Sequence, residues 1–378
     1  MTLPARNITR LWPLAAVLSL WAAFQLTGRL SQMIDFTVNY KAAERLYAGE
    51  TLYPGPEVDG HYEFKYPPLA AFLYLPLAAL PLDTAKSVWA LIVLSASAAS
   101  IWLSLRLVRT GSASPLWTAV VPGLILSRFF LRELELGQVN SLVALLLLLS
   151  VSLFAGPSVR ASSETRQWSA GAVWGLATAL KVTPLIFLPY FLLKKKWRAL
   201  TAGLGVLAAG YVLPAAFYGF AGNGLVHKEW IATLSRSTPH LFSSQDNVSL
   251  LAAAFKLTGR LPLSLWIWCL ATASLGLVLL LFIARGKNVP RPEILESGTM
   301  MLFIPLISPL GWDYTFLLSL PSLTLCFKHF HSLPRAGRFV LAANALLISL
   351  TLYDLLGRRL YAGFMSLSLL SLFFLVLL

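Results

Sequence analysis

Long runs of apolar residues, separated by short polar segments, cover most of this chain of 378 residues. Because a helix rises 1.5 Å per residue, about 20 apolar residues cross the roughly 30 Å hydrocarbon core of a bilayer. Ten runs approach this length and predict membrane-spanning helices at 11–28, 84–108, 115–131, 139–155, 198–218, 262–284, 295–310, 313–327, 337–355 and 360–378.

Two further apolar segments do not fit a simple span. Segment 67–81 begins with two prolines and, as a helix, would reach only about 22 Å, so we expect it to enter the membrane and return. Segment 169–193 is long enough to cross once, but Lys181 and Pro184 interrupt its centre. This interruption favours a hairpin of two short helical arms, with Lys181 near the tip.

Composition supports a polytopic all-α membrane protein. Apolar residues make up 57% of the chain, and only 12% are charged, against roughly 25% in soluble domains. These values exclude a soluble enzyme, a disordered protein and a secreted disulfide scaffold. The two cysteines, Cys269 and Cys326, lie in apolar runs without the spacing of metal ligands.

Basic residues predict the orientation in the membrane. If the N-terminus is cytoplasmic, more than half of the 30 lysines and arginines fall in inner loops, as the positive-inside rule expects. Six of the 16 acids lie between Asp35 and Glu63, within the outer loop 29–66. A second outer loop covers 219–247. We therefore predict one integral membrane domain, 1–378, whose functional site lies at the outer face of the membrane.

Asp35 is the first candidate for chemistry, because it lies where the first predicted helix leaves the lipid. A carboxylate at this depth can be tuned for proton abstraction. The alternative is an acid that begins the next helix, since 36–48 has an amphipathic pattern.

Two lysines are candidate ligands of a phosphate. Lys65 precedes the diproline at 67–68, and Lys181 lies within an apolar segment, where an unpaired charge is costly. The alternative for both is a lysine whose ammonium extends to the membrane surface.

The densest polar cluster between predicted spans is 128–140, which contains Arg128, Arg132, Glu133, Gln138 and Asn140. Its amides and the start of the following helix suit sugar hydroxyls or an anion. The alternative is a turn with a helix cap.

Two further polar segments occur where outer loops re-enter the membrane, around Asn247 and around Trp312-Asp313. Aromatic rings stack on sugar faces and carboxylates accept their hydroxyls, but a connecting turn with an interfacial tryptophan explains the second segment equally well.

Six motifs, in this order, resemble glycosyltransferase family 87 of the GT-C superfamily. The matching pieces are Asp35 with 40–43 and 46–53, Phe64-Lys-Tyr-Pro-Pro-Leu69, Gly137-Gln-Val-Asn140, Leu180-Lys-Val-Thr-Pro184, Asn247-Val-Ser-Leu250 and Ser308-Pro-Leu-Gly-Trp312.

The resemblance implies a bundle of roughly 10–13 transmembrane helices with re-entrant or interfacial helices on the outer face. It implies transfer of a hexose, with mannose expected, from a polyprenyl-monophosphate donor to a lipid or glycan acceptor, with inversion at the anomeric carbon. The expected location is the bacterial cytoplasmic membrane, with the site on its outer face. No metal or other cofactor and no nucleic acid is expected.

By the same resemblance, Asp35 would be the general base that deprotonates the acceptor. The donor phosphate would be bound by Lys65, Arg128, Arg132 and Lys181. The sugar and acceptor would contact Tyr66, Glu133, Gln138, Asn140, Asn247, Trp312 and Asp313.

A transporter or flippase of a lipid-linked glycan is the alternative function. It would explain the embedded lysine, but it predicts inverted repeats and midplane polar residues on several helices, which the sequence lacks.

Overall fold

The computed structural model describes residues 12–28, 33–60, 62–108, 117–155, 164–286 and 290–378. These residues form helices and turns without a strand, which confirms the all-α prediction. The first eight helices are α2 (Trp12–Leu26), α3 (Ile34–Ala48), α4 (Pro56–Asp59), α5 (Pro68–Ala78), α6 (Leu82–Val108), α7 (Trp117–Ile125), α8 (Ser127–Leu136) and α9 (Asn140–Phe154). The middle of the chain forms α10 (Glu164–Leu180), the 3₁₀ helix η2 (Thr183–Ile186), α11 (Phe187–Leu193), α12 (Trp197–Val212), α13 (Ala215–Ser237), η3 (Pro239–Leu241) and α14 (Leu250–Thr258). The last part forms α15 (Leu261–Arg285), α16 (Pro292–Ile307), η5 (Asp313–Ser319), α17 (Leu320–Lys328), η6 (Phe330–Ser332), α18 (Arg335–Leu350), α19 (Tyr353–Ser366) and α20 (Leu369–Leu375).

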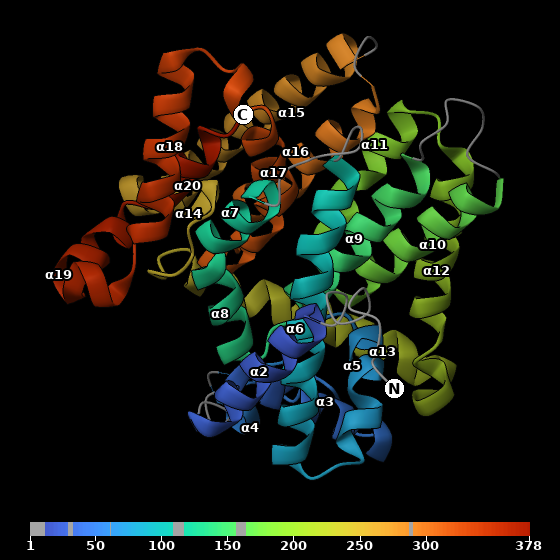
Figure 1. Ribbon diagram of the computed structural model, residues 1–378. Helices are drawn as coiled ribbons and strands as arrows, with labels where there is room; N and C mark the ends of the chain where they lie inside the picture. The colour runs from blue at the N-terminus through green and yellow to red at the C-terminus, as the bar shows by residue number, and fades with distance from the viewer. Residues whose placement is uncertain (1–11, 29–32, 61, 109–116, 156–163, 287–289) are drawn as a thin grey trace, which may run out of the picture.

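Among the described residues, α6 and α15 are each long and apolar enough to cross a bilayer. Two bent pairs also pass this test of length and composition if each is one span. They are α12 with 215–241, bent by 91°, and α18 with α19, bent by 96°. In Figure 1, α6 runs from the bottom of the view, where α3 and α4 lie, toward the top.

Several predicted spans are interrupted in the structure. Within the predicted span 115–131, the described residues from Trp117 onward form two helices, α7 and α8, that meet at Leu126. The predicted span 360–378 is interrupted at Ser368, whose backbone is left-handed. The span predicted at 198–218 ends at Val212, and the predicted loop 219–247 is largely the helix α13. Apolar composition predicts membrane-type segments, but it carries little information on where a helix bends.

The predicted hairpin at 169–193 is confirmed. A straight helix would separate Trp174 and Phe191 by about 25 Å, but their ring centroids are 5.1 Å apart. The chain reverses after Leu180, and the indole N–H of Trp174 donates to the carbonyl of Pro184 at 2.8 Å. Lys181 therefore lies at the turn of the hairpin.

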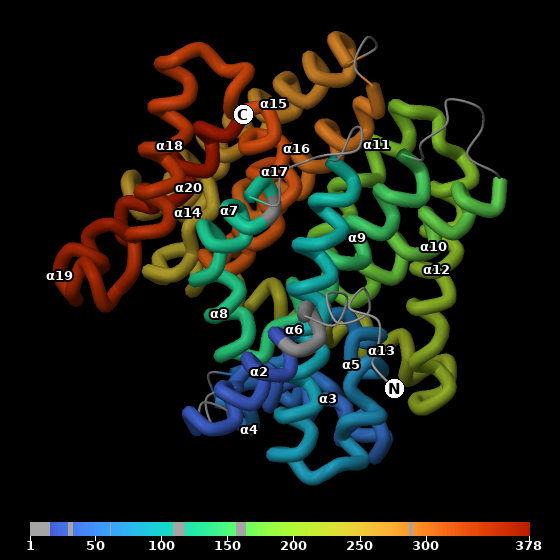
Figure 2. The backbone as a smooth tube through the Cα atoms, viewed as in Figure 1, coloured from blue at the N-terminus to red at the C-terminus, as the bar shows by residue number. Residues whose placement is uncertain are grey.

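Small residues fix the helices that support this turn. Helix α10 packs against α9 and α12, and the three run side by side on the right of Figure 2. A Cβ added at Gly171 would lie 1.9 Å from the carbonyl oxygen of Ala199, and one at Gly203 would lie 2.2 Å from the ring of Trp174. With Gly175, they give the close backbone approach typical of small residues spaced four apart in membrane helices.

Candidate functional site

Most of the predicted site residues line one cavity of about 980 Å³. Its walls come from the start of α3, the turn before α5, the end of α8, the hairpin turn, α13, and the segment between α16 and η5. Eight of the predicted residues line it, namely Asp35, Lys65, Tyr66, Arg132, Gln138, Lys181, Trp312 and Asp313. Four do not, namely Arg128, Glu133, Asn140 and Asn247.

Asp35 is the second residue of α3, so it begins the next helix, as the alternative proposed, and does not end the first predicted helix. Its carboxylate accepts a hydrogen bond from Nε2 of Gln138 at 2.7 Å, and Oε1 of Gln138 accepts one from the hydroxyl of Tyr66 at 2.8 Å. Two residues from different parts of the chain thus orient the carboxylate toward the cavity.

Burial raises the pKa of Asp35 above its usual value, and this effect outweighs the opposing influence of Gln138 and of the positive charges on Lys181, Arg132 and Lys65. A carboxylate that is oriented and more basic than usual is suited to accept a proton.

Gly137 holds this arrangement together. It ends α8 with φ +70°, a conformation that glycine adopts readily, and its carbonyl accepts a hydrogen bond from the indole of Trp89 at 2.8 Å. A Cβ at this position would lie 2.5 Å from Cβ of Phe36, so the turn between α8 and α9 packs directly on the first turn of α3. The close approach places Gln138 beside Asp35.

Lys181 is held by a chain of buried polar groups. Its ammonium donates to Oδ1 of Asn140 at 2.5 Å, and Nδ2 of Asn140 donates to Glu133 at 2.8 Å. The other oxygen of Glu133 accepts the backbone N–H of Ser141, in the first turn of α9, at 2.9 Å. Glu133 and Asn140 were predicted to bind sugar or acceptor, but the structure places them behind the cavity, where they position Lys181.

Two further cations face the cavity. Lys65 is half-buried, and burial lowers the pKa of its ammonium despite the charges of Glu63 and Asp35. Arg132 is half-exposed, and its nearest carboxylate, on Glu135, is 3.8 Å away. With Lys181, they place three positive groups on the same cavity as Asp35, a composition that suits a phosphate.

Arg128, the fourth predicted phosphate ligand, does not line the cavity. Its guanidinium donates to the backbone carbonyl of Thr351, to the hydroxyl of Thr351 at 2.8 Å and to Asp313 at 3.3 Å. These contacts tie α8 to the junction of α18 and α19. They leave Asp313 at the cavity wall with a buried cationic partner.

Asn247 does not line the cavity but holds the backbone segments beside it. Its amide donates to the carbonyls of Leu241 and Pro309, both at 3.1 Å, and its Oδ1 accepts the N–H of Gly311 at 3.0 Å. Asn247 and Trp312 form an antiparallel bridge. Asn247 therefore fixes the segment that presents Trp312 and Asp313 to the cavity.

The sequence interpretation missed the contribution of α13. The cavity is lined by Trp230 and Leu234 of α13, by Thr238, which follows this helix, by Leu241 of η3 and by Trp268 of α15. Trp230, Leu234 and Thr238 are spaced four residues apart, which indicates one helical face, but they occur in the segment 219–247 that the sequence pattern predicts as an outer loop.

Comparison with known proteins identifies the family. The model of glycosyltransferase family 87 matches residues 64–309, about two thirds of the chain. The chain belongs to glycosyltransferase family 87. The match includes Lys65 and Lys181 but ends before Trp312, and Asp35 precedes it. Membership confirms the prediction of a glycosyltransferase over a transporter or flippase.

Two curated relatives carry the same name, polyprenol-phosphate-mannose-dependent alpha-(1-2)-phosphatidylinositol mannoside mannosyltransferase. The Mycobacterium tuberculosis protein is 28% identical over 82% of this chain and 74% of its own length. The Mycolicibacterium smegmatis protein is 27% identical over 85% and 75%. Among solved structures, ArnT from Cupriavidus metallidurans bound to undecaprenyl phosphate aligns with a TM-score of 0.42 and 14% identity, over 99% of this chain and 78% of that chain.

Proposed function

We propose that this glycosyltransferase moves a hexose from a polyprenyl monophosphate to a hydroxyl group of a lipid or glycan acceptor, with inversion at the anomeric carbon. We propose mannose as the hexose. The observation that carries the proposal is the meeting of one oriented carboxylate, Asp35, with three cations on a single cavity. The names of the mycobacterial relatives support mannose and a polyprenyl phosphate donor.

In the proposed reaction, Asp35 accepts the proton of the acceptor hydroxyl as its oxygen attacks the anomeric carbon. The bond between that carbon and the phosphate oxygen breaks, and polyprenyl phosphate leaves with the bonding electrons. The leaving group gains negative charge, which Lys65, Arg132 and Lys181 stabilise. A phosphate leaving group bound by these cations needs no protonation, so one carboxylate suffices.

The remaining groups of the cavity suit the sugar and the acceptor. Trp312 and Asp313 offer a ring face and a carboxylate, and Tyr66 and Gln138 connect to the base through hydrogen bonds. We propose that these groups orient the reacting hydroxyl, because holding the reactants in the attacking geometry lowers the barrier to transfer.

We place the site at the outer face of the bacterial cytoplasmic membrane. The positive residues of the predicted inner loops and the acids of 35–63 support this orientation. Neutralisation of the donor phosphate by side chains also leads us to expect transfer without a metal ion.

The direct test uses purified protein in proteoliposomes with radiolabelled polyprenyl phosphate mannose and a lipid extract as acceptor. We expect label to move from the donor to a new lipid or glycan product. The Lys228→Met variant is the control, because this lysine is exposed and does not line the cavity. Donor binding without product formation over a range of acceptors, or transfer only from a nucleotide sugar, would contradict the proposal.

A further inference from the structure

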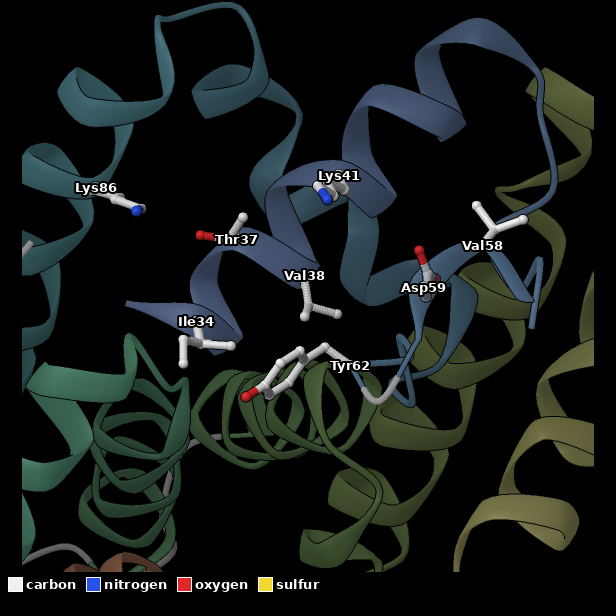
Figure 3. A pocket seen from close by; sticks show the side chains of 8 residues that line it. All are labelled: Ile34, Thr37, Val38, Lys41, Val58, Asp59, Tyr62 and Lys86. Carbon is white, nitrogen blue, oxygen red and sulfur yellow. The ribbon is translucent and has the colours of Figure 1, made fainter. Parts of the chain in front are cut away.

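A second, smaller cavity of about 340 Å³ lies between α3 and α6 (Figure 3). Its walls include Ile34, Thr37, Val38 and Lys41 of α3, Asp59 of α4, and Lys86 of α6. The predicted site contains none of these residues, and the mechanism above does not use them.

Lys86 is the unusual group in this cavity. The residue is only 6% exposed, and its ammonium extends from α6 into the cavity, toward α3 (Figure 3). Within the described part of the chain, no hydrogen bond or ion pair satisfies this ammonium. A mostly buried lysine whose ammonium opens into a cavity, without a partner from the described residues, points to an anionic ligand.

The other charged groups leave the cavity net positive. Lys41 contributes a second cation from α3. Asp59 contributes a carboxylate, but Arg45 already pairs with both of its oxygens, at 2.9 and 2.5 Å. Two cations therefore face a small cavity whose one carboxylate is neutralised, an arrangement that suits a phosphate.

The position along the chain indicates a lipid source for this anion. Helix α6 continues from Leu82 for 27 residues and is one of the candidate membrane spans, so Lys86 lies in the second turn from its start. Lysines near the ends of such helices lie at the depth of lipid headgroups. A volume of about 340 Å³ accommodates a headgroup and not a polyprenyl chain.

The two cavities share a wall. Ile34, Val38 and Tyr62 line both of them. On α3, Ile34, Thr37, Val38 and Lys41 form one stripe facing the small cavity, while Asp35 is rotated by about 100° toward the large one. A molecule anchored in the small cavity therefore lies against the same helical turn that carries the proposed base.

We propose that this cavity binds the phosphodiester headgroup of the lipid acceptor, with Lys86 as its main ligand and Lys41 as the second. This inference rests on the proposed function, because it assigns an anionic phospholipid as the acceptor class. The donor phosphate has its own cations in the large cavity. Binding of the acceptor phosphate to Lys86 would orient the acceptor so that its sugar hydroxyl reaches Asp35.

The test measures phosphatidylinositol binding, without any transfer reaction, to purified protein in phosphatidylcholine nanodiscs. We expect Lys86→Met to weaken this binding at least tenfold, Lys86→Arg to retain most of it, and Lys228→Met to leave it unchanged. Binding of polyprenyl phosphate mannose should stay within about twofold in Lys86→Met, which also reports that this variant is folded.

Unchanged phosphatidylinositol binding in Lys86→Met would overturn the proposal. Inorganic phosphate that binds as tightly as phosphatidylinositol would overturn the lipid assignment. Because this assay requires no transfer, its result is independent of the proposed activity. If transfer occurs while phosphatidylinositol binding is unaffected by Lys86→Met, only the acceptor site is refuted.

Discussion

Replacing Asp35 by asparagine separates a catalytic carboxylate from a structural one. Asparagine has nearly the same size, and its Oδ1 can still accept the hydrogen bond that Gln138 donates at 2.7 Å. It cannot accept the proton of an acceptor hydroxyl. Since loss of a general base costs about 10²–10⁴-fold in rate, we expect Asp35→Asn to transfer sugar at about 1% of the native rate or less.

The same substitution should not destabilise the fold, although it lowers the transfer rate. Burial raises the pKa of Asp35, so the folded state holds the proton more tightly than the unfolded chain does. Above the folded pKa, the ionised carboxylate therefore lowers the free energy of unfolding. The neutral asparagine removes this cost, and we expect Asp35→Asn to unfold at the same temperature as the native protein or higher at pH 7.5.

The raised pKa of Asp35 also predicts how the transfer rate of the native protein depends on pH at the acidic end. Transfer should fall as the pH drops through the raised pKa of Asp35, at a pH above the usual value of 3.8. The assays are radiolabel transfer and thermal unfolding in detergent, with Asp354→Asn as the matched control because Asp354 is exposed on α19. Turnover of Asp35→Asn within about threefold of native would remove Asp35 from the mechanism.

Three further predictions address the donor cations, the turn at Gly137 and the metal. Lys181→Met should raise the KM for the sugar donor at least tenfold, and it should lower the free energy of unfolding by about 1–3 kcal/mol because Oδ1 of Asn140 loses its hydrogen-bond partner. Lys181→Arg should recover part of the affinity for the sugar donor. A native KM in Lys181→Met would refute the proposed role of Lys181 as a phosphate ligand. Gly137→Ala should lower both kcat and the melting temperature, because a left-handed backbone costs about 1–2 kcal/mol without glycine and the new Cβ would displace Phe36. Gly224→Ala, with no atom within 4 Å of its new Cβ, is the control, and equal kcat in the two variants would contradict this account of the turn. Incubation with EDTA followed by removal of divalent ions should leave transfer within about twofold of its initial rate, and a loss that Mg²⁺ or Mn²⁺ restores would contradict the metal-independent proposal.

The sequence located the chemistry better than the helix boundaries. Asp35, Lys65 and Lys181 come from segments far apart in the chain, and they share a cavity as the ordered motifs indicated. The interruption of an apolar segment by Lys181 and Pro184 also predicted the hairpin, because a charge and a proline both disfavour a continuous membrane helix.

Long-range contacts explain what the sequence did not reveal. Arg128 and Arg132 lie one turn apart on α8, yet Arg128 binds Thr351 and Asp313, which are 223 and 185 residues away. The local pattern makes the two arginines equivalent, and only the position of the junction between α18 and α19 distinguishes them. The side of α13 that faces the cavity, with Trp230 and Leu234, likewise lies in a segment whose sequence resembles a loop.

The anomeric configuration of the product tests the central claim most directly. The account assigns one carboxylate, Asp35, as the base of a single displacement, so a β-linked donor must give an α-linked product. The measurement is the ¹³C–¹H coupling constant at the anomeric carbon of the product, formed from a donor with ¹³C at that carbon. We expect the coupling of an α-linkage, and a β-linked product would show that a covalent intermediate and a second nucleophile are required.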